Sequence, residues 1–271
     1  MREFLQEAQN HYLTLQEAAE EMGAEMSQME GGVWQASLTR LRARHGVRVQ
    51  VLPHAEMDVT LRHYDRHRRK LILSELVEPA GRTFQAAFQL GAFEAGDAVD
   101  LVLPASELTR PEERRLGRVT LLNDFAAALL MPYARVLQAA QETGYDVELL
   151  GARFGASFEQ VAHRLTNLAR PGAWGVPFFM VRVDKAGNVS KRFSSGAFPF
   201  ARFGGTCPRW SLHDAFRHPG RVLPQLVEMP DGKRWFSIAR AVRRIATPWG
   251  EPEAEFAIGL GCEERFAPQL V

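Results

Sequence analysis

Basic and aromatic side chains are concentrated between residues 191 and 221. This stretch carries six basic residues, six aromatic residues and a single acid, Asp214. Guanidinium groups bind phosphates through paired hydrogen bonds, and aromatic rings stack on flat bases or line apolar slots. The composition therefore predicts a site for a phosphorylated small molecule. The candidate ligand-binding residues are Arg192, Phe198, Phe200, Arg209, Trp210, Arg217 and Arg221.

Two other interpretations of this stretch stay open. Basic patches with interleaved rings also bind single-stranded nucleic acid. Alternatively, the rings belong to an ordinary core beneath a basic surface. Charge does not decide among them, because residues 171–271 carry 14 Lys and Arg against 9 Asp and Glu, while residues 1–170 carry 19 against 23. A mildly basic C-terminal part fits a small anionic ligand as well as a nucleic acid.

Histidine and cysteine spacing predicts no metal site. His63 and His67 are four residues apart, but they fall in a predicted strand and turn with no Glu between them, which is typical of surface histidines. Cys207, His213 and Cys262 would supply only three ligands, and buried structural thiols are the favoured interpretation. A Cys207–His213 nucleophile pair, which would indicate an enzyme, stays an alternative.

Length and composition exclude several classes of protein. The 271 residues are 46% hydrophobic and 24% charged, so the chain has enough apolar material for a core. No stretch approaches the ~18 consecutive apolar residues of a membrane span, and the charged N-terminus lacks the apolar region of a secretory signal. Phosphate-binding loops and the nucleophile elbow of hydrolases are missing from the sequence. We therefore expect a cytoplasmic protein without membrane contact.

Hydrophobic periodicity predicts a helical first part and a strand-rich second part, hence an α+β fold. Pro171-Gly172 marks the change. The expected helices are 1–22, 34–45, 82–103, 111–130, 133–143, 146–154 and 158–169. The expected strands are 47–52, 59–64, 71–74, 178–183, 189–193, 222–228, 234–243 and 255–262. The apolar stripe of the first helix either packs on its own chain or forms a dimer contact; it consists of Phe4, Ala8, Leu15, Ala19 and Met22.

Two segments of the helical part resemble a metallopeptidase fold. Residues 82–92, Arg-Thr-Phe-Gln-Ala-Ala-Phe-Gln-Leu-Gly-Ala, are similar to the zinc helix of the ImmA/IrrE-type family. Residues 123–132, Asn-Asp-Phe-Ala-Ala-Ala-Leu-Leu-Met-Pro, are similar to its second signature at the expected distance. The resemblance implies a helical domain that follows a strand-turn-strand unit.

The strand-rich part resembles a second family. Residues 205–216, together with 219–221, 230–232 and 257–262, look like the C-terminal domain of the short-chain fatty-acyl-CoA regulators, which are bacterial transcription factors. One branch resembles propionyl-CoA-responsive regulators. The two resemblances together span nearly the whole chain.

The departures from the peptidase pattern bear on function. An active zinc peptidase needs H-E-x-x-H, with two His ligands and a Glu that activates water. The aligned positions are Phe88, Gln89 and Ala92, and the downstream acidic ligand aligns near Leu121. None of these four side chains can ligate zinc or act as a base. The resemblance therefore implies a pseudo-peptidase without metal or catalytic residues, whose former site is either filled by side chains or left as an apolar cavity.

The resemblance predicts three regions: 1–33, an N-terminal helix and possible dimer element; 34–170, the pseudo-peptidase domain; and 171–271, an acyl-CoA-sensing α+β domain. It implies a homodimeric, non-enzymatic sensor for a short-chain acyl-CoA, with propionyl-CoA the first guess and no cofactor. Family members begin with a helix-turn-helix and end in a Cys-rich tail, and neither pattern occurs in this sequence. We therefore expect contact with DNA only through a helix-turn-helix domain outside this chain. The alternatives are a divergent enzyme acting on acyl-CoA or peptide, and a nucleic-acid-binding module.

Overall fold

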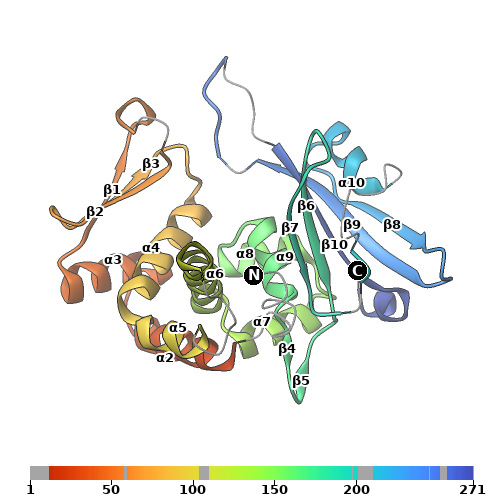
Figure 1. The fold of residues 1–271 in the computed structure, drawn as a ribbon, viewed down its shortest axis with the longest axis horizontal. Coiled ribbons are helices and arrows are strands. Elements are labelled where there is room, and N and C mark those ends of the chain that lie inside the picture. Colours follow the sequence, from red (N-terminus) through yellow and green to blue (C-terminus); the bar gives the residue numbers. More distant parts are fainter. Residues whose placement is uncertain are drawn as a thin grey trace. The chain divides into compact units, whose positions relative to one another are not determined.

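The computed structural model describes most of the chain in two compact units (Figure 1). The first unit comprises the described residues from 12 to 133 together with 245–249, and the second comprises those from 134 to 243 and from 250 to 270. Helical and strand-rich parts follow in the expected order, which confirms the α+β fold. The described residues are 12–57, 60–103, 110–196, 198–200, 210–243, 245–250 and 255–270.

The first unit consists of packed helices with a small sheet at their edge (Figure 1). Its three strands lie in the order β1-β3-β2, with β1 parallel and β2 antiparallel to β3. Helices α2 and α4 both pack against α6. The elements are α2 (Leu13–Ser27), α3 (Gly32–His45), β1 (Arg48–Leu52), η1 (His54–Glu56), β2 (Arg62–Asp65), β3 (Lys70–Ser74), α4 (Pro79–Glu94), α5 (Gly96–Val102) and α6 (Pro111–Leu130).

Local chemistry explains where several of these helices begin and end. Helix α3 stops at Gly46, which adopts a left-handed conformation (φ 65°) and donates its N–H to the last carbonyls of the helix. Pro79 and Pro111 stand at the first turns of α4 and α6, where the missing N–H costs nothing. The expected helix 82–103 is wrong in one respect, because it is two helices. Gly96 has low helix propensity and Asp97 favours a helix N-terminus, so a new helix begins there.

The N-terminal apolar stripe packs on its own chain where the structure describes it. Leu15, Ala19 and Met22 of α2 are buried, and α2 lies against α6. Phe4 and Ala8 lie outside the described residues. The described part of the stripe therefore packs on its own chain, and a dimer contact through the first helix stays a prediction.

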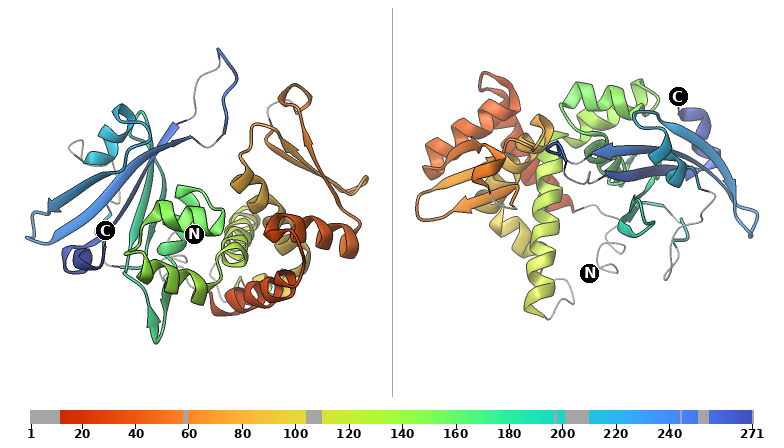
Figure 2. Two further views of the ribbon diagram at one scale, coloured as in Figure 1. Left: turned by 180° about the vertical axis from the view of Figure 1, so that it is seen from behind. Right: turned by 90° about the horizontal axis from the view of Figure 1, so that it is seen from above.

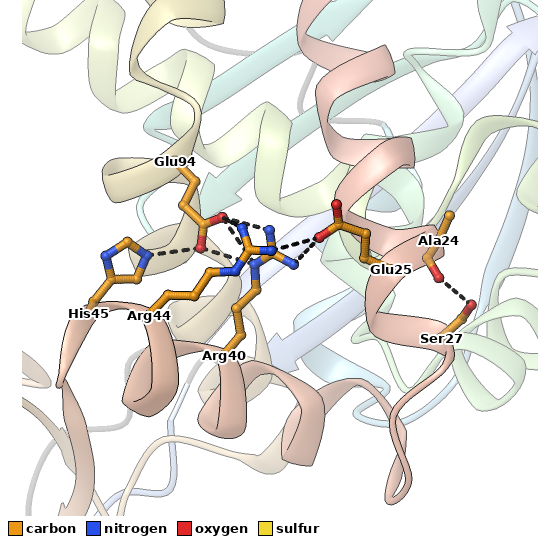
Figure 3. A network of polar contacts seen from close by, with 7 residues as sticks. All are labelled: Ala24, Glu25, Ser27, Arg40, Arg44, His45 and Glu94. Atoms are coloured by element: carbon orange, nitrogen blue, oxygen red, sulfur yellow. Dashed lines mark hydrogen bonds and ion pairs between the residues drawn. The ribbon is translucent and has the colours of Figure 1, made fainter.

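A polar network joins three helices of the first unit (Figure 3). Arg40 of α3 is buried, with 4% of its side chain exposed, and its guanidinium lies between two carboxylates. It contacts Glu94 of α4 through three nitrogen–oxygen distances of 3.0, 3.1 and 2.6 Å, and Glu25 of α2 at 2.6 Å. Arg44 and His45 also reach Glu94, at 3.3 and 2.9 Å. The network therefore ties the ends of α2, α3 and α4 together.

The second unit is a five-stranded antiparallel sheet in the order β7-β6-β10-β9-β8, with helices on both faces. Helices α8 and α9 pack within this unit. The boundary between the two compact units therefore lies near Tyr133, although the helix-rich part of the sequence continues to residue 170. The elements are α7 (Tyr133–Glu142), α8 (Val147–Phe154), α9 (Phe158–Leu165), β4 (Ala169–Arg170), β5 (Ala173–Trp174), β6 (Phe179–Asp184), β7 (Val189–Ser194), α10 (Ser211–Asp214), η2 (Ala215–Arg217), β8 (Leu223–Glu228), β9 (Arg234–Arg243), β10 (Glu255–Glu263) and η3 (Glu264–Gln269).

The two faces of this sheet have different neighbours. Helices α8 and α9 lie on one side and α10 on the other (Figure 2). Cross-strand pairing places Val181 of β6, Gly259 of β10 and Ala239 of β9 in one row. The side chain of Leu212 from α10 lies over this row, so these residues mark the α10 face. No helix in the part of the chain that the structure describes is long and apolar enough to cross a membrane.

Candidate functional site

Five aromatic rings gather on the α10 face of the second unit. We call Phe179, Phe198, Phe200, Trp210 and Trp235 the aromatic cluster. Phe198 stacks on Phe179 with ring centroids 3.7 Å apart and meets Trp235 edge-on at 4.9 Å. Phe200 and Trp210 lie 4.9 and 6.1 Å from Phe198. The structure therefore brings together all three aromatic residues that the sequence proposed as pocket walls.

Glycines in β10 make room for these rings. A Cβ at Gly261 would lie 2.6 Å from Cζ of Phe179, and one at Gly259 would lie 3.2 Å from Cδ1 of Leu212. Any side chain at Gly261 would therefore displace the buried Phe179 ring. Trp210 is oriented by its indole N–H, which donates to Oγ of Ser237 at 3.1 Å. The cluster is thus a set of mostly edge-to-face rings in which Phe179 and Trp235 are buried, Phe198, Phe200 and Trp210 are partly exposed, and the indole N–H of Trp210 is held in place.

Sequence reasoning missed two members of the cluster. Phe179 and Trp235 are 1% and 2% exposed and stand on β6 and β9, outside the stretch that attracted attention. A signal for them exists in the two glycines at positions 259 and 261 of an otherwise apolar strand, which indicate close approach of other groups. Only strand register shows which residues fill that space.

The four candidate arginines, unlike the three candidate aromatic residues, are not all brought together by the structure. Arg192 is paired in register with Val181, so it lies on the same sheet face as the aromatic cluster. Arg217 and Arg221 are exposed, and Arg217 contacts Asp214 at 3.3 Å. Arg209 lies outside the described residues. Among the three candidate arginines that the structure describes, Arg192 is the one that shares a sheet face with the rings.

The opposite face of the sheet carries a buried ion-pair cluster. Glu159 of α9 contacts Arg182 at 2.9 Å and Lys191 at 2.6 Å. Arg182 also lies over the ring of Phe256, 4.6 Å from its centroid. Burial, reinforced by the charge of Lys191, lowers the pKa of His163 to about 3, so this imidazole is neutral at physiological pH. These contacts fasten α9 to β6 and β7 and supply no free catalytic group.

The peptidase-like positions of the first unit lie on α4 and α6. Gln89 is 3% exposed, Leu121 is fully buried, and Phe88 and Ala92 are half-buried. Oε1 of Gln89 accepts a hydrogen bond of 2.5 Å from Nη2 of Arg62, whose guanidinium carbon lies 5.0 Å from the Phe88 centroid. These side chains do not fit a zinc ion, because a phenyl ring, a carboxamide and a methyl group are poor ligands and a cation stands beside them.

The remaining metal and nucleophile candidates show no gathered ligands. Within the described ranges, no three His, Cys, Asp or Glu side chains lie close enough to hold a metal ion. His63 lies on β2 and His67 in the turn after it, as predicted. Burial raises the pKa of the Cys262 thiol to about 12, which leaves it protonated and unreactive. Cys207 lies outside the described residues, so the Cys207–His213 pair stays a prediction.

A surface hollow that sequence reasoning did not anticipate lies between α3 and β1. Its volume is about 790 Å³, in the range of small-molecule sites. The lining is mixed, with Leu38 and Val49 as apolar members and Arg42 and Arg48 as basic ones. It is a second place where a small anionic ligand could sit.

Comparison with known proteins identifies the family of both parts of the chain. Residues 42–166 match the model of the IrrE N-terminal-like domain, and residues 167–271 match the short-chain fatty acyl coenzyme A regulator C-terminal domain. A solved chain described as a Mycobacterium tuberculosis transcriptional regulator is 38% identical and superposes with a TM-score of 0.92, covering 100% of this chain and 82% of that one. The chain belongs to the short-chain fatty acyl-CoA regulator family.

Curated relatives of this family carry regulatory names. The transcriptional regulators RamB and PrpR of Mycobacterium tuberculosis are 40% and 38% identical over the whole chain, which covers 57% and 56% of them. The propionyl-CoA carboxylase regulator of Cereibacter sphaeroides is 46% identical over 76% of the chain and 45% of that protein. The chain thus spans about half the length of these relatives. In this chain the aromatic cluster falls within the segment that matches the acyl-CoA regulator C-terminal domain, and Arg62, Phe88 and Gln89 fall within the segment that matches the IrrE-like domain.

Proposed function

We propose that this chain is the effector-binding part of a transcriptional regulator and that its effector is a short-chain acyl-CoA, with propionyl-CoA the first candidate. The observation that carries the proposal is the aromatic cluster on the α10 face. It lies in the domain whose family is named for short-chain fatty acyl-CoA, and Arg192 shares its sheet face. The name of the Cereibacter relative points to propionyl-CoA metabolism.

The chemistry of the cluster suits the parts of such a ligand. Stacked rings with one oriented indole offer a surface for an adenine or an acyl chain. Arg192 supplies a guanidinium for a phosphate at the edge of that surface. Arg209, Arg217 and Arg221 stay candidates for the other phosphates, since exposed arginines can turn toward a bound polyanion.

The regulatory part of the proposal concerns the longer protein. We propose that it binds DNA through a helix-turn-helix domain outside this chain, acts as a homodimer in the cytoplasm and performs no chemistry on its ligand. An effector shifts such a regulator only if it binds one conformational state more tightly than another. A ligand bound at the aromatic cluster would favour the conformational state in which its rings have the arrangement described above.

The test is isothermal titration calorimetry of this chain against propionyl-CoA, acetyl-CoA, butyryl-CoA and free CoA. We expect saturable binding near one ligand per chain, with a preference among the acyl groups. Trp210→Ala should weaken binding about tenfold, because one aromatic stacking contact of about 1.5 kcal/mol is lost. The matched control is Trp249→Ala, since Trp249 is fully exposed and should leave affinity unchanged.

Several outcomes would contradict the proposal. Equal binding of all four compounds would show that the chain recognises the CoA part alone and does not distinguish acyl groups. Release of free CoA thiol would indicate the enzyme alternative. Loss of binding in Arg48→Met, with Trp210→Ala unaffected, would move the site to the hollow between α3 and β1. Salt-dependent binding of random oligonucleotides in place of acyl-CoA would favour the nucleic-acid alternative.

A further inference from the structure

Arg62 on β2 is a half-buried cation with an unusual set of neighbours. Among the residues that the structure describes, its only hydrogen bond goes to the neutral Oε1 of Gln89. Its Nε is buried and has no hydrogen-bond partner there. Arg40 and Arg182, by contrast, contact carboxylates at 2.6 and 2.9 Å. Arg62 therefore differs from these two in lacking a negative neighbour.

The energetic consequence is an uncompensated positive charge. Burial lowers the pKa of Arg62, but a guanidinium remains protonated in proteins. Gln89 satisfies one donor without neutralising the charge, and the face of Phe88 adds a cation–π contact at 5.0 Å. Burying a charge without a counter-charge is costly, so the arrangement is stabilised by any anion that binds there.

The donors that remain around Arg62 suit an oxyanion. A guanidinium presents a planar fork that matches the two oxygens of a carboxylate or phosphate. Because Oε1 of Gln89 already accepts from Arg62, the amide NH₂ of Gln89 is left to donate to the same ligand. Phe88 stands on α4 one position before Gln89 and covers one face of the guanidinium, which directs the ligand to its edge.

We propose that the position which holds zinc in active IrrE-like peptidases is an oxyanion site in this protein, built from Arg62, Gln89 and Phe88, and that it takes a carboxylate or phosphate group. Gln89 is the residue on which the proposal depends. A glutamate at this position would neutralise the charge of Arg62, and an added anion would then no longer stabilise the site. This site is in the first unit, so the proposal stands independently of the acyl-CoA site on the second.

The experiment measures thermal stabilisation and calorimetric binding of the full chain with inorganic phosphate and with acetate, at constant ionic strength set with chloride. We expect saturable binding of at least one of the two anions. Arg62→Met should weaken it about 10- to 100-fold, the range expected for loss of a charge-assisted hydrogen bond. The matched control Arg66→Met removes an exposed arginine of the β2–β3 turn and should leave binding unchanged.

A second variant keeps the proposal falsifiable if Arg62→Met affects folding. Gln89→Glu supplies an internal carboxylate at the 2.5 Å contact with Arg62, so we expect a higher melting temperature without anion and loss of the anion-dependent rise. Two results would overturn the proposal: no saturable binding of either anion to the parent chain, or unchanged anion binding in Gln89→Glu.

A competition experiment identifies the source of the anion. If saturating propionyl-CoA abolishes phosphate binding to the parent chain, and Arg62→Met also weakens propionyl-CoA binding, a CoA phosphate occupies the site. If phosphate binds equally well beside saturating propionyl-CoA, the site takes a separate small anion. Both results support an oxyanion site, whereas failure of propionyl-CoA to bind anywhere affects only the function proposed above.

Discussion

Replacing Arg40 by Met should destabilise the first unit more than any other single charge removal in the network of Figure 3. The guanidinium is 4% exposed and makes three contacts with Glu94, which is 13% exposed. Its fourth contact, with Glu25, is half-exposed and contributes little. Methionine preserves most of the apolar volume but leaves the Glu94 carboxylate buried without its main partner.

The expected cost follows from these exposures. Breaking a buried, hydrogen-bonded ion pair costs about 3–5 kcal/mol. Arg44 and His45 still contact Glu94, at 3.3 and 2.9 Å, and reduce the penalty, so we expect a loss of about 3 kcal/mol of unfolding free energy. Arg44→Met is the control, since that side chain is 55% exposed and should cost under about 1 kcal/mol.

Urea unfolding followed by circular dichroism measures both variants. The double variant Arg40→Met with Glu94→Leu should recover about 1–2 kcal/mol relative to Arg40→Met alone, because no buried charge is left unpaired. If Arg40→Met costs no more than Arg44→Met, or if the double variant is the least stable of all, the reasoning from burial is refuted.

Three further predictions concern a carboxylate, a helix contact and a thiol. Burial alone would raise the pKa of Glu94, but hydrogen bonds from Arg40 and His45 outweigh burial and lower the pKa below 4.5. The stability that the Glu94 carboxylate supplies is therefore present above pH 4.5 and is lost as the pH falls toward the lowered pKa. The urea midpoint of Glu94→Gln should accordingly depend less on pH than that of the parent chain. Gly91→Ala would place Cβ 2.6 Å from Cδ1 of Phe125 and should cost about 1–3 kcal/mol, seen as a lower melting temperature; an unchanged value would mean that α4 and α6 can separate freely. In a Cys207→Ser background, Cys262 should react with iodoacetamide only after unfolding, because burial raises its pKa to about 12; rapid labelling of the native protein would contradict its placement.

Local signals predicted most of the elements correctly. Ser157 accepts from the backbone N–H of Gln160 at 3.3 Å, and the Gln160 side chain accepts from the N–H of Ser157 at 2.8 Å, as the capping box predicts. The strands of the three-stranded and five-stranded sheets fall within a few residues of the expected segments, whereas the two-residue strands β4 and β5 were not expected. Two helices differ: the expected helix 82–103 is interrupted at Gly96 although its apolar periodicity continues, and the expected helix 158–169 ends at Leu165.

The sites were predictable only in part. A basic and aromatic segment pointed to Phe198, Phe200 and Trp210, and the structure brings them together. Phe179 and Trp235 join them through strand pairing across long stretches of sequence, which no local pattern encodes. The pairing of Arg62 with Gln89 likewise joins residues 27 positions apart on different elements.

The sequence by itself determined the order of helices and strands and the family resemblance, and with it the prediction that Phe88, Gln89, Ala92 and Leu121 stand where a zinc peptidase has its ligands and base. These properties depend on residue identity and on neighbours within a few positions, where periodicity, caps and motifs act. Only the tertiary structure decided which rings share the α10 face and that Arg62 lies against Gln89 without an acid. Those facts depend on strand register and helix packing, because whether a charge is compensated is set by the residues that surround it in space.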